Sequence, residues 1–155
     1  MPQKLTFRPV EEDDCELIFN WANDPFTREN SFNTESINWD EHIIWFANKL
    51  RTDNCLFYIF FYNEKAVGQV RIDISNDEGV INFSVDRQFR RHGYGTTMLE
   101  ILPDIVEGVR PGTRLTGTVK ADNQASIKAF ERAGYKILRT TKENESKTIT
   151  FQYSI

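Results

Sequence analysis

Residues 80–102 combine three local patterns that restrict the fold more than any other stretch of the chain. Apolar and polar residues alternate from Val80 to Val85, which is typical of a strand with one buried face. A basic turn with two glycines, residues 90–95, comes next, and residues 96–102 then read as a helix. A strand, a turn and a helix in this order predict an α/β unit whose backbone N–H groups converge where the helix begins.

Such a turn is suited to bind a phosphate. The N–H groups of residues 91–96 can point at one anion, the helix start adds a partial positive charge, and Arg90 and Arg91 add full charges. An ordinary tight turn on a solvated basic face is the competing interpretation. Two other phosphate motifs are excluded, because a dinucleotide fingerprint needs a third glycine where Met98 stands, and the chain contains no Gly-Lys-Ser/Thr run.

A second informative segment lies at residues 123–135, after a predicted strand. As local structure it predicts a helix, with Asp122 or Asn123 as its N-cap and Gly134 as its left-handed end. The buried stripe of this helix consists of Ile127, Phe130 and Ala133.

The two segments together resemble a known superfamily. Arg90, Gly93 and Gly95 form the Arg-x-x-Gly-x-Gly pattern of the pyrophosphate loop in the Gcn5-related N-acetyltransferases (GNAT). Residues 123–135 resemble the Asn-x-x-Ala/Ser…Gly-Phe/Tyr segment of the same superfamily, at the usual distance. The resemblance implies an enzyme that transfers the acetyl group of acetyl-CoA to an amine.

Composition agrees with one small enzyme domain, residues 1–155. The chain is 39% hydrophobic and 27% charged, has no apolar run long enough to cross a bilayer, and begins with no signal peptide. We therefore expect a cytoplasmic protein with no membrane partner. The net charge of −4 argues against a nucleic-acid partner. Two unrelated cysteines and two histidines predict reduced thiols and no metal site.

The remaining periodicities predict a mixed, mostly antiparallel central sheet with helices on both faces. Strands are expected at residues 5–8, 55–62, 67–74, 80–85, 114–119, 136–140 and 148–153, and helices at residues 11–22, from 38 onward, 96–102 and 123–133. Residues 23–33 are expected to form a loop. Pro103 should break or kink its helix, because proline lacks an N–H and crowds the carbonyl of Leu99. The strand–helix–strand order at residues 80–119 predicts one parallel pair.

The resemblance also implies which residues hold the cofactor. In the family, the central strands separate, and the pantetheine arm lies between them against the backbone of the first strand, here Phe83, Ser84 and Val85. The side chain of the asparagine at position 123 contacts the same arm in the family. The full set expected to bind acetyl-CoA adds Arg90, Arg91, His92, Gly93, Tyr94, Gly95, Thr96, Ser126 and Phe130.

Two positions depart from the catalytic pattern of the family. Asn82 stands where many members carry a glutamate base, and Phe130 stands where many carry a tyrosine that protonates the leaving thiolate. We expect Asn82 to hold a water, His42 to accept the proton, with Asp73 as the alternative, and Ser126 or a water to protonate the thiolate. The departures leave open a non-catalytic acyl-CoA-binding module.

Residues 21–46 resemble one bacterial branch of the superfamily. Its members acetylate 4-amino sugars carried on nucleotides, on routes to surface glycans such as pseudaminic acid. The resemblance implies that substrate is bound by Arg28, Ser31, Phe32, Trp39 and Trp45, although packing and a solvated loop charge are the simpler interpretations. A protein or small-amine acetyltransferase of the same fold is the alternative. The particular acceptor, the base and a possible homodimer stay open.

Overall fold

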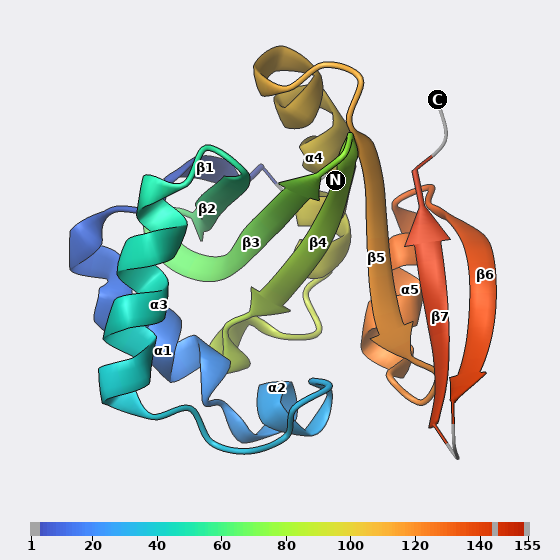
Figure 1. Ribbon diagram of the computed structural model, residues 1–155. Helices are drawn as coiled ribbons and strands as arrows, with labels where there is room; N and C mark the ends of the chain where they lie inside the picture. Colours follow the sequence, from blue (N-terminus) through green and yellow to red (C-terminus); the bar gives the residue numbers. More distant parts are fainter. Residues whose placement is uncertain (1–3, 144–145, 154–155) are drawn as a thin grey trace.

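A computed structural model describes residues 4–143 and 146–153, and Figure 1 shows their arrangement. The strands are β1 (Thr6–Pro9), β2 (Cys55–Tyr62), β3 (Lys65–Ser75), β4 (Glu78–Val85), β5 (Arg114–Lys120), β6 (Lys136–Glu143) and β7 (Ser146–Gln152). The α-helices are α1 (Cys15–Ala22), α2 (Pro25–Glu29), α3 (Trp39–Arg51), α4 (Tyr94–Val109) and α5 (Gln124–Arg132). Short 3-10 turns precede α1 and follow β4.

The seven strands form one mixed sheet in the order β1-β2-β3-β4-β5-β7-β6. Only β4 and β5 pair in parallel, while the other neighbours are antiparallel, as the sequence predicts. Apolar side chains on the two faces form separate clusters. One joins α4 and α5 to the sheet through residues such as Leu102 and Phe130, and the other joins α1 and α3 to it through residues such as Trp21 and Phe46.

The predicted loop at residues 23–33 contains a helix that the sequence analysis missed. Asp24 caps α2 by accepting a hydrogen bond from the Thr27 N–H at 3.2 Å, and Pro25 occupies the first helical position. The predicted helix at residues 11–22 begins instead as a 3-10 turn, and regular α1 starts at Cys15. Asn38 caps α3 as expected, accepting from the N–H groups of Asp40 and Glu41.

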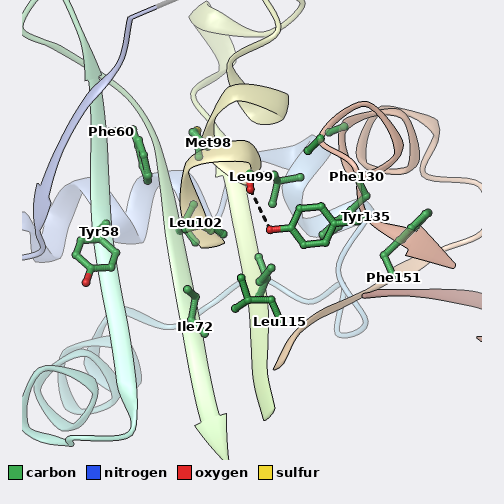
Figure 2. Packing of buried hydrophobic residues seen from close by; sticks show 14 of the residues in the cluster. Tyr58, Phe60, Ile72, Met98, Leu99, Leu102, Leu115, Phe130, Tyr135 and Phe151 are labelled. Atoms are coloured by element: carbon green, nitrogen blue, oxygen red, sulfur yellow. Dashed lines mark hydrogen bonds between the residues drawn. The ribbon is translucent and has the colours of Figure 1, made fainter. Parts of the chain in front are cut away.

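Pro103, which was expected to break or kink its helix, does not break it, since α4 runs through Pro103 to Val109. The Leu99 carbonyl, four residues earlier, has no N–H partner at Pro103, but the Tyr135 hydroxyl donates to it at 2.9 Å (Figure 2). This bond is buried beside Phe130 and Leu102 in the larger apolar cluster (Figure 2). A tertiary donor therefore satisfies the carbonyl that proline leaves without a partner inside the helix.

The parallel pair β4 and β5 joins only at one end. Paired residues run from Glu78 opposite Arg114 to Val80 opposite Thr116, and the pairing stops there although β4 continues to Val85. Figure 1 shows the two strands meeting near the β3–β4 turn and separating toward α2. The expected separation of the central strands is therefore present, and it leaves the second half of β4 without a neighbour on this side.

Candidate active site

A cleft of about 1230 Å³ begins where β4 and β5 separate. One part is lined by the turn after β4, the start of α4 and the start of α5. The other part is lined by α2 with the residues that follow it, by α3, and by β3. The cleft thus extends from the predicted phosphate turn to the region expected to receive the acceptor.

The separated half of β4 presents backbone groups to this cleft. The Asp86 N–H donates to the Val67 carbonyl of β3 at 2.7 Å, so the backbone groups of Asp86 face β3. Because these groups alternate in direction along a strand, those of Phe83 and Val85 face the opposite side, where β5 has moved away. The Val85 carbonyl accepts from Arg90 Nε at 3.1 Å, whereas the N–H groups of Phe83 and Val85 remain available to a ligand.

The turn after β4 has the backbone shape of an anion site. Arg91 and Gly93 adopt left-handed conformations, with φ of 69° and 80°. Gly93 immediately precedes the 16-residue helix α4, so the first N–H groups of α4 point toward the turn. The residues of the turn that line the cleft are Arg90, Arg91, Gly93, Tyr94, Gly95 and Thr96. His92 is not among them, and the Tyr94 ring is buried in the core, so Tyr94 can contribute only its backbone.

Arg90 is engaged differently from the expectation that it would bind the pyrophosphate. Its guanidinium forms an ion pair with Asp24 at 2.8 Å and lies over the Phe26 ring at 4.8 Å. Its Nε donates to the Val85 carbonyl, so Arg90 fastens α2 to the turn. Trp21 of α1 makes a second such link, since its indole N–H donates to Asp86 at 2.7 Å. Arg91 is the arginine of the turn whose side chain is left for a phosphate.

Asn123 and Ser126 lie together at the start of α5 and line the cleft. The Asn123 side-chain oxygen accepts from the Ser126 N–H at 3.2 Å, which makes Asn123 the N-cap that the sequence predicts. Its side-chain N–H₂ group is not used by this bond. The geometry therefore allows Asn123 to cap α5 with its oxygen and to donate to a pantetheine carbonyl with its nitrogen.

Variants at position 123 separate these two roles. Asn123→Ala should weaken acetyl-CoA binding by about 1–2 kcal/mol, because a buried hydrogen bond is lost. It should also lower the free energy of unfolding by about 1 kcal/mol through loss of the cap. Asn123→Ser restores a capping oxygen but not the amide donor, so its stability should return while its affinity stays low. Calorimetry and thermal unfolding measure the two effects, and full recovery of affinity in the serine variant would mean that Asn123 acts only as a cap.

Phe130 lines the inner wall of the cleft but belongs mainly to the core. It is 1% exposed, stacks on Phe151 at 5.1 Å, and meets Phe83 edge-on. The tip of its ring lies over Gly117 of β5, where a Cβ atom would be only 2.4 Å from Cζ. A tyrosine hydroxyl at position 130 would therefore meet the β5 backbone. A tyrosine at this position is therefore expected to strain the core rather than to supply a proton donor to the thiolate.

At the acceptor end, Arg28 holds its own loop. Its Nε donates to the Ala22 carbonyl at 2.6 Å, and Nη1 donates to the carbonyls of Asn33 and Glu35. Its Nη2 donates to the Ser31 hydroxyl, which in turn donates to the Thr27 carbonyl. These bonds use four of the five N–H donors of Arg28 and hold the Ser31 hydroxyl in place, so both residues shape the loop that borders the cleft, and their expected role in binding substrate stays a prediction.

The aromatic residues expected to bind substrate have different positions. Trp39 does not line the cleft and packs edge-on against Phe19. Trp45 lines the cleft, but the Arg71 guanidinium lies over it at 5.0 Å and the His42 ring lies beside it at 5.6 Å. Phe32 is 64% exposed and borders the cleft, so of these three residues it is the one that both is exposed and lines the cleft.

His42, the expected base, lies in the aromatic layer between α1 and α3. It borders the cleft yet is only 2% exposed, and its Nε2 lies 3.0 Å from the Cys15 carbonyl oxygen, so Nε2 carries a hydrogen. Burial lowers the pKa of His42, with the Cys15 carbonyl opposing this effect. This environment favours a neutral packing residue over a base that exchanges protons with the cleft.

His42 should therefore affect stability more than turnover. Its pKa is lowered in the folded state, whereas the unfolded value is about 6.5, so the unfolded chain binds more protons below that pH. The free energy of unfolding should fall as pH drops from about 7 through 6.5 and below, and His42→Gln should flatten this slope. Denaturant unfolding across pH 5.5–8.5 checks the slope. A loss of kcat by roughly 10²–10⁴ in His42→Gln would instead restore the base assignment.

Two polar residues of β3 that the sequence analysis did not single out line the acceptor end of the cleft. The Gln69 amide N–H₂ group donates to Asn82 Oδ1 and to Ser84 Oγ, both at 3.1 Å, and thereby fixes both β4 side chains. One lone pair of the Asn82 oxygen remains for a water. Arg71 lies opposite Asn82 in the β3–β4 register. In the sequence, Gln69 and Arg71 alternate with apolar residues of β3, and this alternation was the one signal that could have pointed to them. The same alternation is also typical of a strand with an ordinary solvent-facing side.

With this geometry in place, comparison with known proteins identifies the class. A family described as Acetyltransferase (GNAT) domain matches residues 4–136. The chain therefore belongs to this acetyltransferase family. A curated relative, an uncharacterized protein of Methanocaldococcus jannaschii, is 25% identical over 154 residues, which cover 92% of this chain and 30% of that protein. This chain therefore spans less than a third of the length of that relative.

Several solved structures share the fold at low sequence identity. RimL, a ribosomal L7/L12 alpha-N-protein acetyltransferase in complex with coenzyme A, superposes with a TM-score of 0.85 at 15% identity, covering 99% of this chain and 96% of that chain. Spermidine N-acetyltransferase from Vibrio cholerae in complex with CoA and spermine gives 0.86 at 14% identity, covering 96% and 94%. AAC(6')-Ib in complex with acetyl-CoA gives 0.83 at 15% identity, covering 98% and 94%.

Two further findings concern the described residues only. No helix among them combines the length and the apolar character needed to cross a membrane. No group of three or more His, Cys, Asp or Glu side chains among them is arranged to hold a metal ion.

Proposed function

We propose that the chain transfers the acetyl group of acetyl-CoA to the 4-amino group of a nucleotide-linked amino sugar. The charge of the cleft is the observation that carries this choice of acceptor. Among the described residues, the charged side chains that line it are seven basic ones and two acidic ones, Glu41 and Asp122. The basic ones are Arg28, Arg71, Arg87, Arg90, Arg91, Lys128 and Arg132.

This balance favours an anionic acceptor over a polycationic one. Spermine and aminoglycosides carry several positive charges, and a cleft with two carboxylates offers them little compensation. The phosphates of acetyl-CoA account for part of the basic excess near the turn, but Arg71 lies on β3, across from Asn82 and away from that turn. A diphosphate on the acceptor would match the remaining positive charge. A protein N-terminus or another small amine is the alternative, in line with the shared fold of RimL.

The proposed chemistry depends on placement more than on a dedicated base. The amine nitrogen attacks the thioester carbonyl carbon, a C–N bond forms, and the C–S bond breaks as the thiolate leaves. The available N–H groups of Phe83 and Val85 would polarise the carbonyl as in an oxyanion hole. The amine reaches the cleft neutral, and after the attack its nitrogen releases one proton to a water beside Asn82. Ser126 or a water protonates the leaving thiolate.

A panel of acceptors tests the proposal. UDP-linked 4-amino sugars, spermidine, an aminoglycoside and a peptide with a free N-terminus are each incubated with acetyl-CoA, and thiol release is followed. We expect the highest kcat/KM with a UDP-amino sugar. Turnover confined to the peptide or to the polyamine would replace the proposed acceptor. Tight CoA binding without turnover of any amine would favour an acyl-CoA-binding module instead.

A further inference from the structure

We infer that Arg71, which the sequence did not single out, is the residue that recognises a diphosphate on the acceptor. The inference rests on the proposed function for its acceptor, but it concerns a separate site on β3. It assigns to this one guanidinium the choice between acceptors that carry a diphosphate and acceptors that do not.

The Arg71 guanidinium is held in place before any ligand binds. Its Nε donates to Asp73 Oδ2 at 3.0 Å, and its Cζ lies 5.0 Å from the centre of the Trp45 ring. Neither Nη atom has a protein partner in the part of the chain that the structure describes, and neither is a buried unsatisfied atom. Two donors of a rigid planar fork therefore remain open to the cleft, an arrangement suited to bidentate binding of phosphate oxygens.

The charges around Arg71 leave a positive excess. Asp73 pairs with Arg71 and also with Lys49 at 2.9 Å, so one carboxylate is shared by two cations. Burial by itself would raise the pKa of Asp73, but the hydrogen bonds and charges of Lys49 and Arg71 outweigh it and lower that pKa. Asp73 is therefore ionised and saturated, and it does not cancel the charge that Arg71 presents to the cleft.

The position of Arg71 separates it from the phosphates of acetyl-CoA. Arg71 is opposite Asn82, three residues before Val85, which is about 10 Å along the strand from the end that leads into the phosphate turn. The backbone between these points is where the pantetheine arm is proposed to lie. A pyrophosphate held at the start of α4 therefore does not occupy Arg71, whereas an acceptor amine near Asn82 brings its own substituents close to it.

The test measures pyrophosphate binding by calorimetry to protein already saturated with CoA, so that the cofactor's phosphate site is filled. Wild type should bind pyrophosphate, and Arg71→Met should lose at least about 10-fold in affinity, because charge-assisted hydrogen bonds are removed. Arg71→Lys keeps the charge without the fork and should fall between the two. Arg139→Met is the matched control, since Arg139 is exposed on β6 outside the cleft and the net charge changes equally.

Absence of pyrophosphate binding in the CoA-saturated wild type would overturn the inference. Equal affinity in wild type and Arg71→Met, or an equal loss in Arg139→Met, would overturn it as well. If Arg71→Met does not fold, Arg71→Lys alone tests the inference. Unchanged pyrophosphate affinity in Arg71→Lys would then count against bidentate binding by the Arg71 guanidinium. The probe contains neither sugar nor amine, so Arg71-dependent binding stands even if every UDP-amino sugar proves inert, and that failure would count against the proposed acceptor only.

Discussion

Gly95→Val should lower the affinity for acetyl-CoA by at least about 100-fold, the largest binding effect expected of any single change in this chain. A Cβ atom at Gly95 would already lie 3.2 Å from the Phe83 ring and 3.7 Å from the Val85 side chain. The two further methyl groups of valine would extend from this crowded position, the second residue of α4, beside the N–H groups that are proposed to hold the pyrophosphate. Gly93→Val should act as strongly, because the φ of 80° at Gly93 is costly for a β-branched residue.

Gly108→Val is the control for both variants. Gly108 lies in the same helix, and no atom stands within 4 Å of a Cβ placed there. Calorimetry with acetyl-CoA should therefore give wild-type affinity for Gly108→Val. Wild-type affinity in Gly95→Val, with the variant folded, would remove the pyrophosphate from the start of α4 and with it the proposed placement of the cofactor.

Gly117→Val should cause the largest loss of stability, about 3 kcal/mol or more, because the added atoms would overpack a rigid part of the core. A Cβ atom at Gly117 would lie 2.4 Å from Phe130 Cζ, and Phe130 cannot retreat because it stacks on Phe151 and meets Tyr135 edge-on. Figure 2 shows these three aromatic side chains together. Phe130→Tyr should be destabilising for the same reason, since its hydroxyl points at the same backbone.

A double-mutant cycle gives this prediction a sharp form. Phe130→Leu removes the ring tip, so Gly117→Ala should cost much less in that background than in the wild type. Urea unfolding measures the four free energies, and a coupling energy in the range of 0.5–3 kcal/mol is expected for residues in contact. Additive losses would show that β5 moves aside and that the contact over Gly117 is not rigid.

The strands, the antiparallel hairpins and the single parallel pair could be predicted, because alternation and turns are encoded locally. The failures share a different cause. Pro103 was expected to break or kink its helix, yet α4 continues through it, and the group that donates to the Leu99 carbonyl, Tyr135, is 36 residues away from Leu99 in the chain. The helix α2 was missed because its signal, an aspartate followed by proline, also marks an ordinary turn.

The candidate site shows the same limit. The phosphate turn was recognisable because its glycines and its helix are consecutive in the sequence. The roles of Arg28 and Arg90 could not be recognised from the sequence. Arg28 donates to three nearby backbone carbonyls, and Arg90 donates to Asp24, which is 66 residues away in the chain. Arg71 looked like an exposed strand residue until the structure placed Trp45 beneath it. The sequence around an arginine thus indicates where in the fold the residue lies, while its hydrogen-bond and ion-pair partners decide what its side chain does.

The position of β7 has a consequence for how this domain is made. Although β7 follows β6 in the sequence, it lies inside the sheet, between β5 and β6, and Phe151 on it is fully buried against Phe130. On the ribosome, the strands from β1 to β5 leave the exit tunnel first, and until β7 arrives they expose an unpaired edge of β5 and an open side of the core. The sheet therefore cannot be completed before β7 has left the exit tunnel, and nascent chains that stop before Phe151 are expected to be the ones that chaperones and proteases recognise.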